Sequence, residues 1–266
     1  MRIMWLAVLI LLSACSTSKK AVSNVSQPAS TMIPDGKIFT SVFQQKAAEY
    51  KALCLQAYNI ARLRLDQYTS APGKPMAIVT DIDETVLDNS PYAVHQALLN
   101  RDYDQATWYD WTSKAEADTV PGAPSFFKYV ASRNITIFYI TNREEKERAA
   151  TLKNLQKYNF PYADNEHLLL KQNVSSKEAR RQEVAAKYDI ALLLGDNLAD
   201  FSSLFDKKTE SERLENTRNS ADMFGSKFIV LPNANYGDWE NALYNYNYKL
   251  TLTQKDSVLR SKVKGY

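Results

Sequence analysis

The sequence predicts an α/β protein with a doubly wound, mostly parallel sheet. Three observations support this class: short apolar runs of strand length recur along the chain, stretches with helical character separate them, and polar residues follow most of them directly. With 266 residues, 45% of them hydrophobic and 24% charged, the chain can bury a sizeable core. The five runs are Met76–Val79, Ile135–Ile140, His167–Leu170, Ile190–Leu194 and Phe228–Leu231.

The chain begins with features of an export signal. One positive charge at Arg2 precedes an apolar run that is too short to span a bilayer and fits the hydrophobic part of a signal peptide. We therefore expect residues 1–14 to be a lipoprotein signal peptide that is cleaved before Cys15. The Ser-rich residues 15–36 show no periodicity, which is typical of a flexible tether, here one lipidated at Cys15.

The folded domain is expected to span 37–266. Apolar residues at helical spacing over 37–68 predict one long amphipathic helix or a pair, ended by Pro72-Gly73. A smaller, mainly helical accessory region is expected from about 37–72, 86–120 and the C-terminus. Further helices are predicted between the strands, at 123–132, 144–158, 176–188 and 197–223.

The scarce residue types exclude several function classes. The seven glycines are too widely spaced to form a GxGxxG dinucleotide loop or a GxxxxGK[ST] phosphate loop. Two histidines and two cysteines are too few for a zinc site or a disulfide framework. The net charge is only +3 and the sequence contains no block of basic residues, so nucleic-acid binding is not expected.

Polar residues stand where four of the predicted strands end, and parallel strands bring their carboxyl ends to one edge of the sheet. The segments are Thr80–Thr85, Thr141–Arg143, Gly195–Asn197 with Asp200 one turn on, and Pro232–Tyr236. We therefore expect the functional site at this edge.

Two carboxylates at the first strand end indicate metal-assisted chemistry. Asp81 and Asp83 are two residues apart, so on extended backbone both point the same way, and a hard cation would relieve their repulsion. Oxygen ligands from Asp81 and Asp196 suit Mg²⁺. With a metal and a phosphate dianion present, Asp81 can be a nucleophile and Asp83 an acid/base. Taken alone, such a pair is more often a capping or solvated pair.

Three more residues are candidates around that pair. Thr141 could donate to a phosphate oxygen, although a β-branched residue often just finishes a strand. Lys177, near a helix start, could balance phosphoryl charge, with Lys171 as a competitor and a solvated first-turn lysine as the ordinary alternative. Asp200 could support the metal shell or orient Lys177, or be an exposed helix residue.

Long segments of the chain resemble a known family. The segment from Ile78 to Tyr92 (IVTDIDETVLDNSPY) looks like the first signature of the class C bacterial acid phosphatases, lipoproteins of the haloacid dehalogenase superfamily. The segment from Leu192 to Phe201 resembles their second signature, and Phe228 to Glu240 resembles their closing segment. The Leu12-Ser13-Ala14-Cys15 sequence is similar to their lipobox.

The resemblance implies roles for individual residues. Asp81 would be nucleophile and Mg²⁺ ligand, Asp83 the acid/base with its backbone carbonyl on the metal, and Asp196 the other ligand. Thr141, Asn142 and Lys177 would hold phosphate, and Asp200 would support the single Mg²⁺. The same likeness implies lipidation of Cys15 and a cell-envelope location at the bacterial outer membrane.

The resemblance also implies substrates, which are phosphomonoesters including nucleoside 5′-monophosphates and nicotinamide mononucleotide. Aromatic residues make up 11% of the chain. Tyr92, Trp108 and Tyr236 lie where the family places substrate clamps, and we expect them to stack on a base or nicotinamide ring, although each could instead pack the helical cap. A homodimer is a further expectation.

Two other functions remain open. A non-catalytic lipoprotein could capture nucleotides with the same residues, but pure binding does not need both Asp81 and Asp83. A phosphotransferase could pass an aspartyl-phosphate to a nucleoside instead of water, and the sequence does not separate this from hydrolysis.

Overall fold

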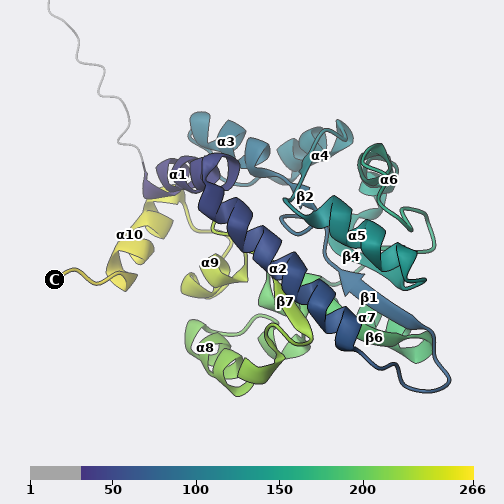
Figure 1. The fold of residues 1–266 in the computed structure, drawn as a ribbon. Helices are drawn as coiled ribbons and strands as arrows, with labels where there is room; N and C mark the ends of the chain where they lie inside the picture. The colour runs from purple at the N-terminus through teal and green to yellow at the C-terminus, as the bar shows by residue number, and fades with distance from the viewer. Residues whose placement is uncertain (1–30) are drawn as a thin grey trace, which may run out of the picture.

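A five-stranded parallel sheet forms the centre of the molecule (Figure 1). The computed structural model describes residues 31–266. The strands lie in the order β5-β4-β1-β6-β7 and comprise β1 (Met76–Thr80), β4 (Thr136–Glu144), β5 (Leu168–Lys171), β6 (Asp189–Gly195) and β7 (Phe228–Val230). All five predicted strands are present, and the predicted doubly wound α/β class is confirmed.

The strand order places a crevice at the end of β1. From β1 the chain moves outward through β4 and β5, and then returns to the other side of β1 to form β6 and β7. The connections on either side of β1 therefore run in opposite directions. In open parallel sheets this reversal separates the loops and leaves room for a ligand at the carboxyl ends of the strands.

Helices cover both faces of the sheet, and alternate strand residues fill the two cores. On one face Ile78, Ile137 and Leu192 pack with residues of α2 (Ala48–Gln67) and α5 (Ala123–Ser132). On the other face the intervening residues, such as Val79 and Phe138, pack with α7 (Glu178–Lys187). The strands therefore read as continuous apolar runs because both of their faces are buried.

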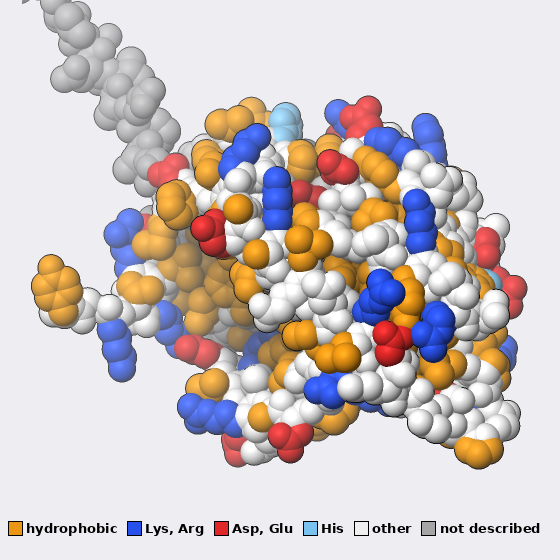
Figure 2. All heavy atoms as spheres, in the orientation of Figure 1, with side chains coloured by type: hydrophobic (Ala, Val, Ile, Leu, Met, Phe, Trp, Pro, Cys, Tyr) orange, Lys and Arg blue, Asp and Glu red, His pale blue; other side chains and the backbone are white. Residues whose placement is uncertain are grey.

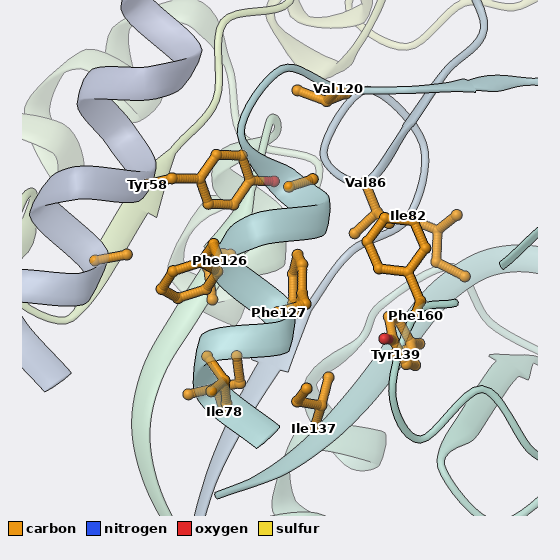
Figure 3. Packing of buried hydrophobic residues seen from close by; sticks show 14 of the residues in the cluster. Tyr58, Ile78, Ile82, Val86, Val120, Phe126, Phe127, Ile137, Tyr139 and Phe160 are labelled. Carbon is orange, nitrogen blue, oxygen red and sulfur yellow. The ribbon is translucent and has the colours of Figure 1, made fainter. Parts of the chain in front are cut away.

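An aromatic cluster joins α2 and α5 to the sheet (Figure 3). Phe127 of α5 is fully buried, and its ring centroid lies 6.1 Å from Tyr58, 6.1 Å from Tyr139 and 5.7 Å from Phe160. The Tyr58 hydroxyl donates to the backbone carbonyl of Thr85, at 2.5 Å. The cluster thereby fixes the segment that follows β1.

Smaller elements stand outside the sheet. They are α1 (Met32–Lys46), β2 (Leu87–Asp88), α3 (Ser90–Leu98), α4 (Gln105–Ser113), β3 (Asp118–Thr119), α6 (Arg148–Lys157), α9 (Asp238–Leu243) and α10 (Leu252–Lys262). The predicted helix over 37–68 is a pair, since the backbone turns extended at Ala47. Because α1 begins at Met32, residues 32–36 belong to this helix and not to the expected tether.

The single helix predicted over 197–223 is wrong. The segment forms three short 3₁₀ turns, Leu198–Asp200, Ser203–Phe205 and Ala221–Met223, and one helix, α8 (Glu210–Asn219). Polar side chains of Asn197, Ser202 and Thr209 each accept a backbone N–H and start a new turn. Side chains of this kind compete with helical hydrogen bonding, which divides the segment.

The expected signal peptide (1–14), Cys15 and most of the expected tether lie outside the described residues. Among residues 31–266, no helix combines the length and apolar character that crossing a membrane requires. The second cysteine, Cys54, is fully buried, and burial raises its pKa to about 11.

We expect Phe127→Ala to lower the free energy of unfolding by about 3–5 kcal/mol, because it leaves a cavity among four aromatic rings. Urea denaturation followed by circular dichroism measures this change. Phe39→Ala is the matched control, since the Phe39 side chain is 78% exposed and its removal should cost little. Equal losses in the two variants would show that the aromatic cluster does not hold the domain together.

Candidate active site

Asp81 follows β1 directly and lies at the reversal point of the sheet. Its backbone N–H donates to the carbonyl of Leu194 in β6, at 2.9 Å, so the strand pairing continues to this residue. Its side chain is buried, and burial raises the pKa of Asp81 to about 7, with Asp200 and Asp83 adding to the rise and Lys177 opposing it. The strand itself therefore fixes where this carboxylate lies.

Lys177 connects two of the predicted site aspartates. Its Nζ lies 2.5 Å from Oδ1 of Asp81 and 2.7 Å from Oδ1 of Asp200. All three side chains are buried. Burial alone would lower the pKa of Lys177, but the charges of Asp200 and Asp81 raise it above its ordinary value. The lysine therefore stays cationic beside the aspartate at the end of β1.

Asp196 completes a group of three carboxylates. Asp81, Asp196 and Asp200 each offer an oxygen within 4.8 Å of the others. Burial, followed by the charges of Asp200 and Asp81, raises the pKa of Asp196 well above its usual range. Asn233, after β7, donates to Asp196 at 2.7 Å. Three acids with one nearby lysine leave excess negative charge, and their oxygen donors fit a hard divalent cation.

Asp83 is held apart from this group by a buried arginine. Arg143 donates to it from two nitrogens, with Nη2 at 2.7 Å and Nε at 3.1 Å from Oδ1. Asn89 donates to the same oxygen at 2.9 Å, and the Thr141 hydroxyl lies 3.5 Å from Oδ2. The expected metal contact of Asp83 is through its backbone carbonyl, and that contact stays a prediction.

The other predicted phosphate-binding residues stand at the end of β4. Thr141 is buried and accepts from the Arg143 backbone N–H at 3.1 Å. Asn142 is exposed, and its side-chain oxygen accepts from Arg180 at 2.9 Å. Lys171, the competing lysine, donates instead to Glu144 at 2.8 Å. The geometry therefore favours Lys177 over Lys171.

The three predicted stacking residues do not have equal surroundings. Tyr236 donates its hydroxyl to Glu84, and burial raises the pKa of both groups well above their usual ranges. Tyr92 and Trp108 are buried edge to face at 5.2 Å, and Trp108 donates to Glu147 at 3.0 Å. The structure thus gives Tyr92 and Trp108 packing partners, and stacking on a substrate stays a prediction for all three.

A cavity of about 470 Å³ joins most of these residues. Its walls include Asp81, Asp83, Lys177, Asp196 and Asp200 at the edge of the sheet. The three aromatic residues, Asn142 and residues of α1, α9 and α10 line it as well. This size suits a small organic ligand.

Sequence analysis missed several residues that hold this site together. Arg143 stands in the quoted Thr-Asn-Arg segment, and Glu84 and Asn89 stand in the first signature, so their positions were visible but their partners were not. Arg180 donates to the Thr141 carbonyl at 2.5 Å and the Ser176 carbonyl at 3.2 Å. No sequence signal marks such a bridge between loops.

A parallel sheet with aspartates, a lysine and a threonine at its carboxyl edge defines a phosphoryl-transfer protein of the haloacid dehalogenase type. The chain belongs to subfamily IIIB of the HAD superfamily, the acid phosphatases, whose family model matches residues 4–239. This confirms the relationship that the two signatures indicated.

Solved structures and relatives found by sequence support the same family. The class C acid phosphatase from Bacillus anthracis is 41% identical, with a TM-score of 0.84 over 88% of this chain and 99% of that one. A second structure of that enzyme has tungstate bound and is 40% identical. The stem 31 kDa glycoprotein of Glycine max is 26% identical over 49% of this chain, and the match spans about half (53%) of its own length. Acid phosphatase 1 of Solanum lycopersicum is 26% identical over 31% of this chain and 32% of its own length.

We expect Gly195→Ala to reduce turnover of an aryl phosphate by about 10- to 100-fold, the effect of losing one hydrogen bond to a charged group. The added Cβ would lie 2.7 Å from the carboxyl carbon of Asp200, too close for both to stay in place, so Asp200 must shift from its position beside Lys177. Steady-state kinetics measures the loss. Gly36→Ala is the control, because a Cβ there meets no atom within 4 Å. Full activity in Gly195→Ala would contradict a role for the Asp200–Lys177 contact.

Proposed function

We propose that the protein hydrolyses phosphomonoesters with Mg²⁺, through an aspartyl-phosphate on Asp81. One observation carries the proposal: the Asp81 carboxylate at the end of β1 lies 2.5 Å from a buried lysine and beside two further carboxylates. A lysine so close can balance the charge of a phosphoryl group. The second acid, Asp83, to which we assign proton transfer, stands outside that group and accepts from Arg143.

In the first step an Asp81 oxygen attacks phosphorus while the bond from phosphorus to the ester oxygen breaks. Asp83 gives its proton to the departing alkoxide. In the second step water attacks the aspartyl-phosphate, Asp83 takes a proton from that water, and the bond from phosphorus to Asp81 breaks. Phosphate leaves and both acids return to their starting states.

Mg²⁺ would be held by Asp81, Asp196 and the backbone carbonyl of Asp83, with Asp200 supporting them. When bound, it would neutralise the carboxylates and the phosphate oxygens. Lys177, Thr141 and Asn142 would bind the phosphate. The tungstate in the relative from Bacillus anthracis is a tetrahedral oxyanion like phosphate, and supports an oxyanion site in this fold.

Nucleoside 5′-monophosphates and nicotinamide mononucleotide fit as substrates. The cavity of about 470 Å³ has Tyr92, Trp108 and Tyr236 in its walls, and aromatic rings bind a planar base by stacking. The phosphotransferase alternative uses the same aspartyl-phosphate with a hydroxyl acceptor in place of water. Product analysis with added nucleoside separates the two.

We further propose that the chain is anchored outside the cytoplasm by lipid on Cys15, at the bacterial outer membrane. The support is the short apolar run that ends in Leu12-Ser13-Ala14-Cys15. Mass spectrometry of membrane extracts would detect acylation, and Cys15→Ser should release the protein from the membrane fraction.

We expect Asp81→Asn to reduce phosphate release from a chromogenic ester to background, with and without added Mg²⁺, because an amide cannot replace the nucleophile. Asp110→Asn, an exposed position on α4, is the control. EDTA should abolish phosphate release by the unmodified protein, and added Mg²⁺ should restore it. Undiminished turnover in Asp81→Asn would reject the covalent step, whereas binding of nucleotide without any turnover in the unmodified protein would favour the capture alternative.

We expect Tyr236→Ala to raise KM for a nucleotide about 5- to 100-fold, since stacking on one ring contributes about 1–3 kcal/mol. KM for a small non-aromatic phosphate ester should change far less. Tyr236→Phe keeps the ring but loses the bond to Glu84, so it separates stacking from that hydrogen bond. If Tyr236→Ala affects both substrates equally, Tyr236 does not clamp the base.

A further inference from the structure

The cavity that contains the aspartates is also lined by a cluster of charged side chains from outside the sheet. This charged clamp consists of Lys37 of α1, Asp102 between α3 and α4, and Lys255 of α10, and all three line the cavity. The Asp102 carboxylate accepts from both lysines, at 2.7 Å from Lys37 and 2.6 Å from Lys255. The clamp has no part in the proposed chemistry.

The three clamp side chains are largely enclosed, since each exposes between 14% and 19% of its surface. Burial alone would raise the pKa of Asp102, but the charges of Lys37 and Lys255 hold it well below its usual range. Glu240 of α9 lies 4.0 Å from Lys37, at the outer limit of an ion pair. Asp102 therefore bridges Lys37 and Lys255 as a carboxylate.

The clamp matters because α10 has little else to hold it. None of its residues is buried, and in Figure 1 it stands at the edge of the molecule beside α1. Figure 2 shows hydrophobic side chains in the hollow next to it. Besides Lys255, two residues of α10 form hydrogen bonds to other elements. The Asp256 carboxylate accepts from the Met32 backbone N–H at 3.1 Å, and the exposed Lys262 donates to Glu210 at 2.9 Å. Polar contacts and half-buried apolar residues such as Leu252 and Leu259, rather than fully buried side chains, keep α10 at the cavity.

We propose that the charged clamp of Lys37, Asp102 and Lys255 closes the cavity at the end remote from Asp81 and thereby determines the size of the leaving group that the enzyme accepts. This inference rests on the proposed phosphomonoesterase function. A leaving group of nucleoside size fits in front of the clamp. A longer leaving group, such as the dinucleoside phosphate released from a 5′-phosphorylated dinucleotide, meets the clamp and requires α10 to move.

The test compares the release of 5′-phosphate from a dinucleotide with that from the mononucleotide, expressed as a ratio of kcat/KM values. Lys255→Met and Asp102→Asn both break the clamp, yet one removes a positive charge and the other a negative charge. If the clamp acts as a wall, both variants raise the ratio by at least about fivefold. Lys264→Met is the control, because Lys264 is an exposed lysine just after α10 that does not line the cavity, and its loss should leave the ratio unchanged.

Two results overturn the inference. Ratios that move in opposite directions in Lys255→Met and Asp102→Asn would show that the clamp acts through its charge on an anionic substrate. Unchanged ratios, with normal hydrolysis of the mononucleotide, would show that the cavity is not closed here, and leave the proposed function intact. If the unmodified protein hydrolyses neither ester, the proposed function fails, and the ratio of dissociation constants for the same two nucleotides tests the clamp.

Discussion

The electrostatic repulsion among carboxylates at the end of β1 is the constraint on which the rest of the site depends. Asp81, Asp196 and Asp200 bring oxygens within 4.8 Å of one another, and such a group is stable only when cations offset it. Lys177 contacts two of the three, and Arg143 pairs with the fourth acid, Asp83. Charge balance therefore divides the acids into two sets, one of three carboxylates with Lys177 and one of Asp83 with Arg143.

This division explains why the surrounding backbone is so closely fixed. Lys177, just before α7, contacts residues that follow β1 and β6, and Arg180 joins the start of α7 to the end of β4 through the carbonyls of Thr141 and Ser176. Asp200 reaches Lys177 only because Gly195 has no Cβ in its way. Positions far apart in the chain thus maintain the ion pairs of Lys177. A substitution at any of them would displace Lys177 and thereby change the surroundings of Asp81.

The sequence allowed the strands, and the residues at their ends, to be predicted because both are local. A buried strand is a continuous apolar run, and a strand end brings the next residue to a known edge, so Asp81, Thr141 and Asp196 could be placed without coordinates. The prediction of a single helix over 197–223 was wrong because capping side chains such as Asn197 and Thr209 override its helical periodicity. Arg143 and Arg180 were not predicted as site residues, because their roles depend on partners 38–60 residues away.

The charged clamp extends the same argument to specificity. At the sheet edge, the aspartates follow buried strands and are paired with Lys177 and Arg143, which are themselves buried. At the remote end of the cavity, Lys37, Asp102 and Lys255 come from three segments outside the sheet, and α10 contributes no buried residue. Chemistry therefore resides on the rigid part of the molecule, while the choice of leaving group depends on a part held by polar contacts. On the proposed role of the clamp, substitutions in α1 or α10 would alter that choice without disturbing the aspartates, because function is set by individual sites and not by the fold as a whole.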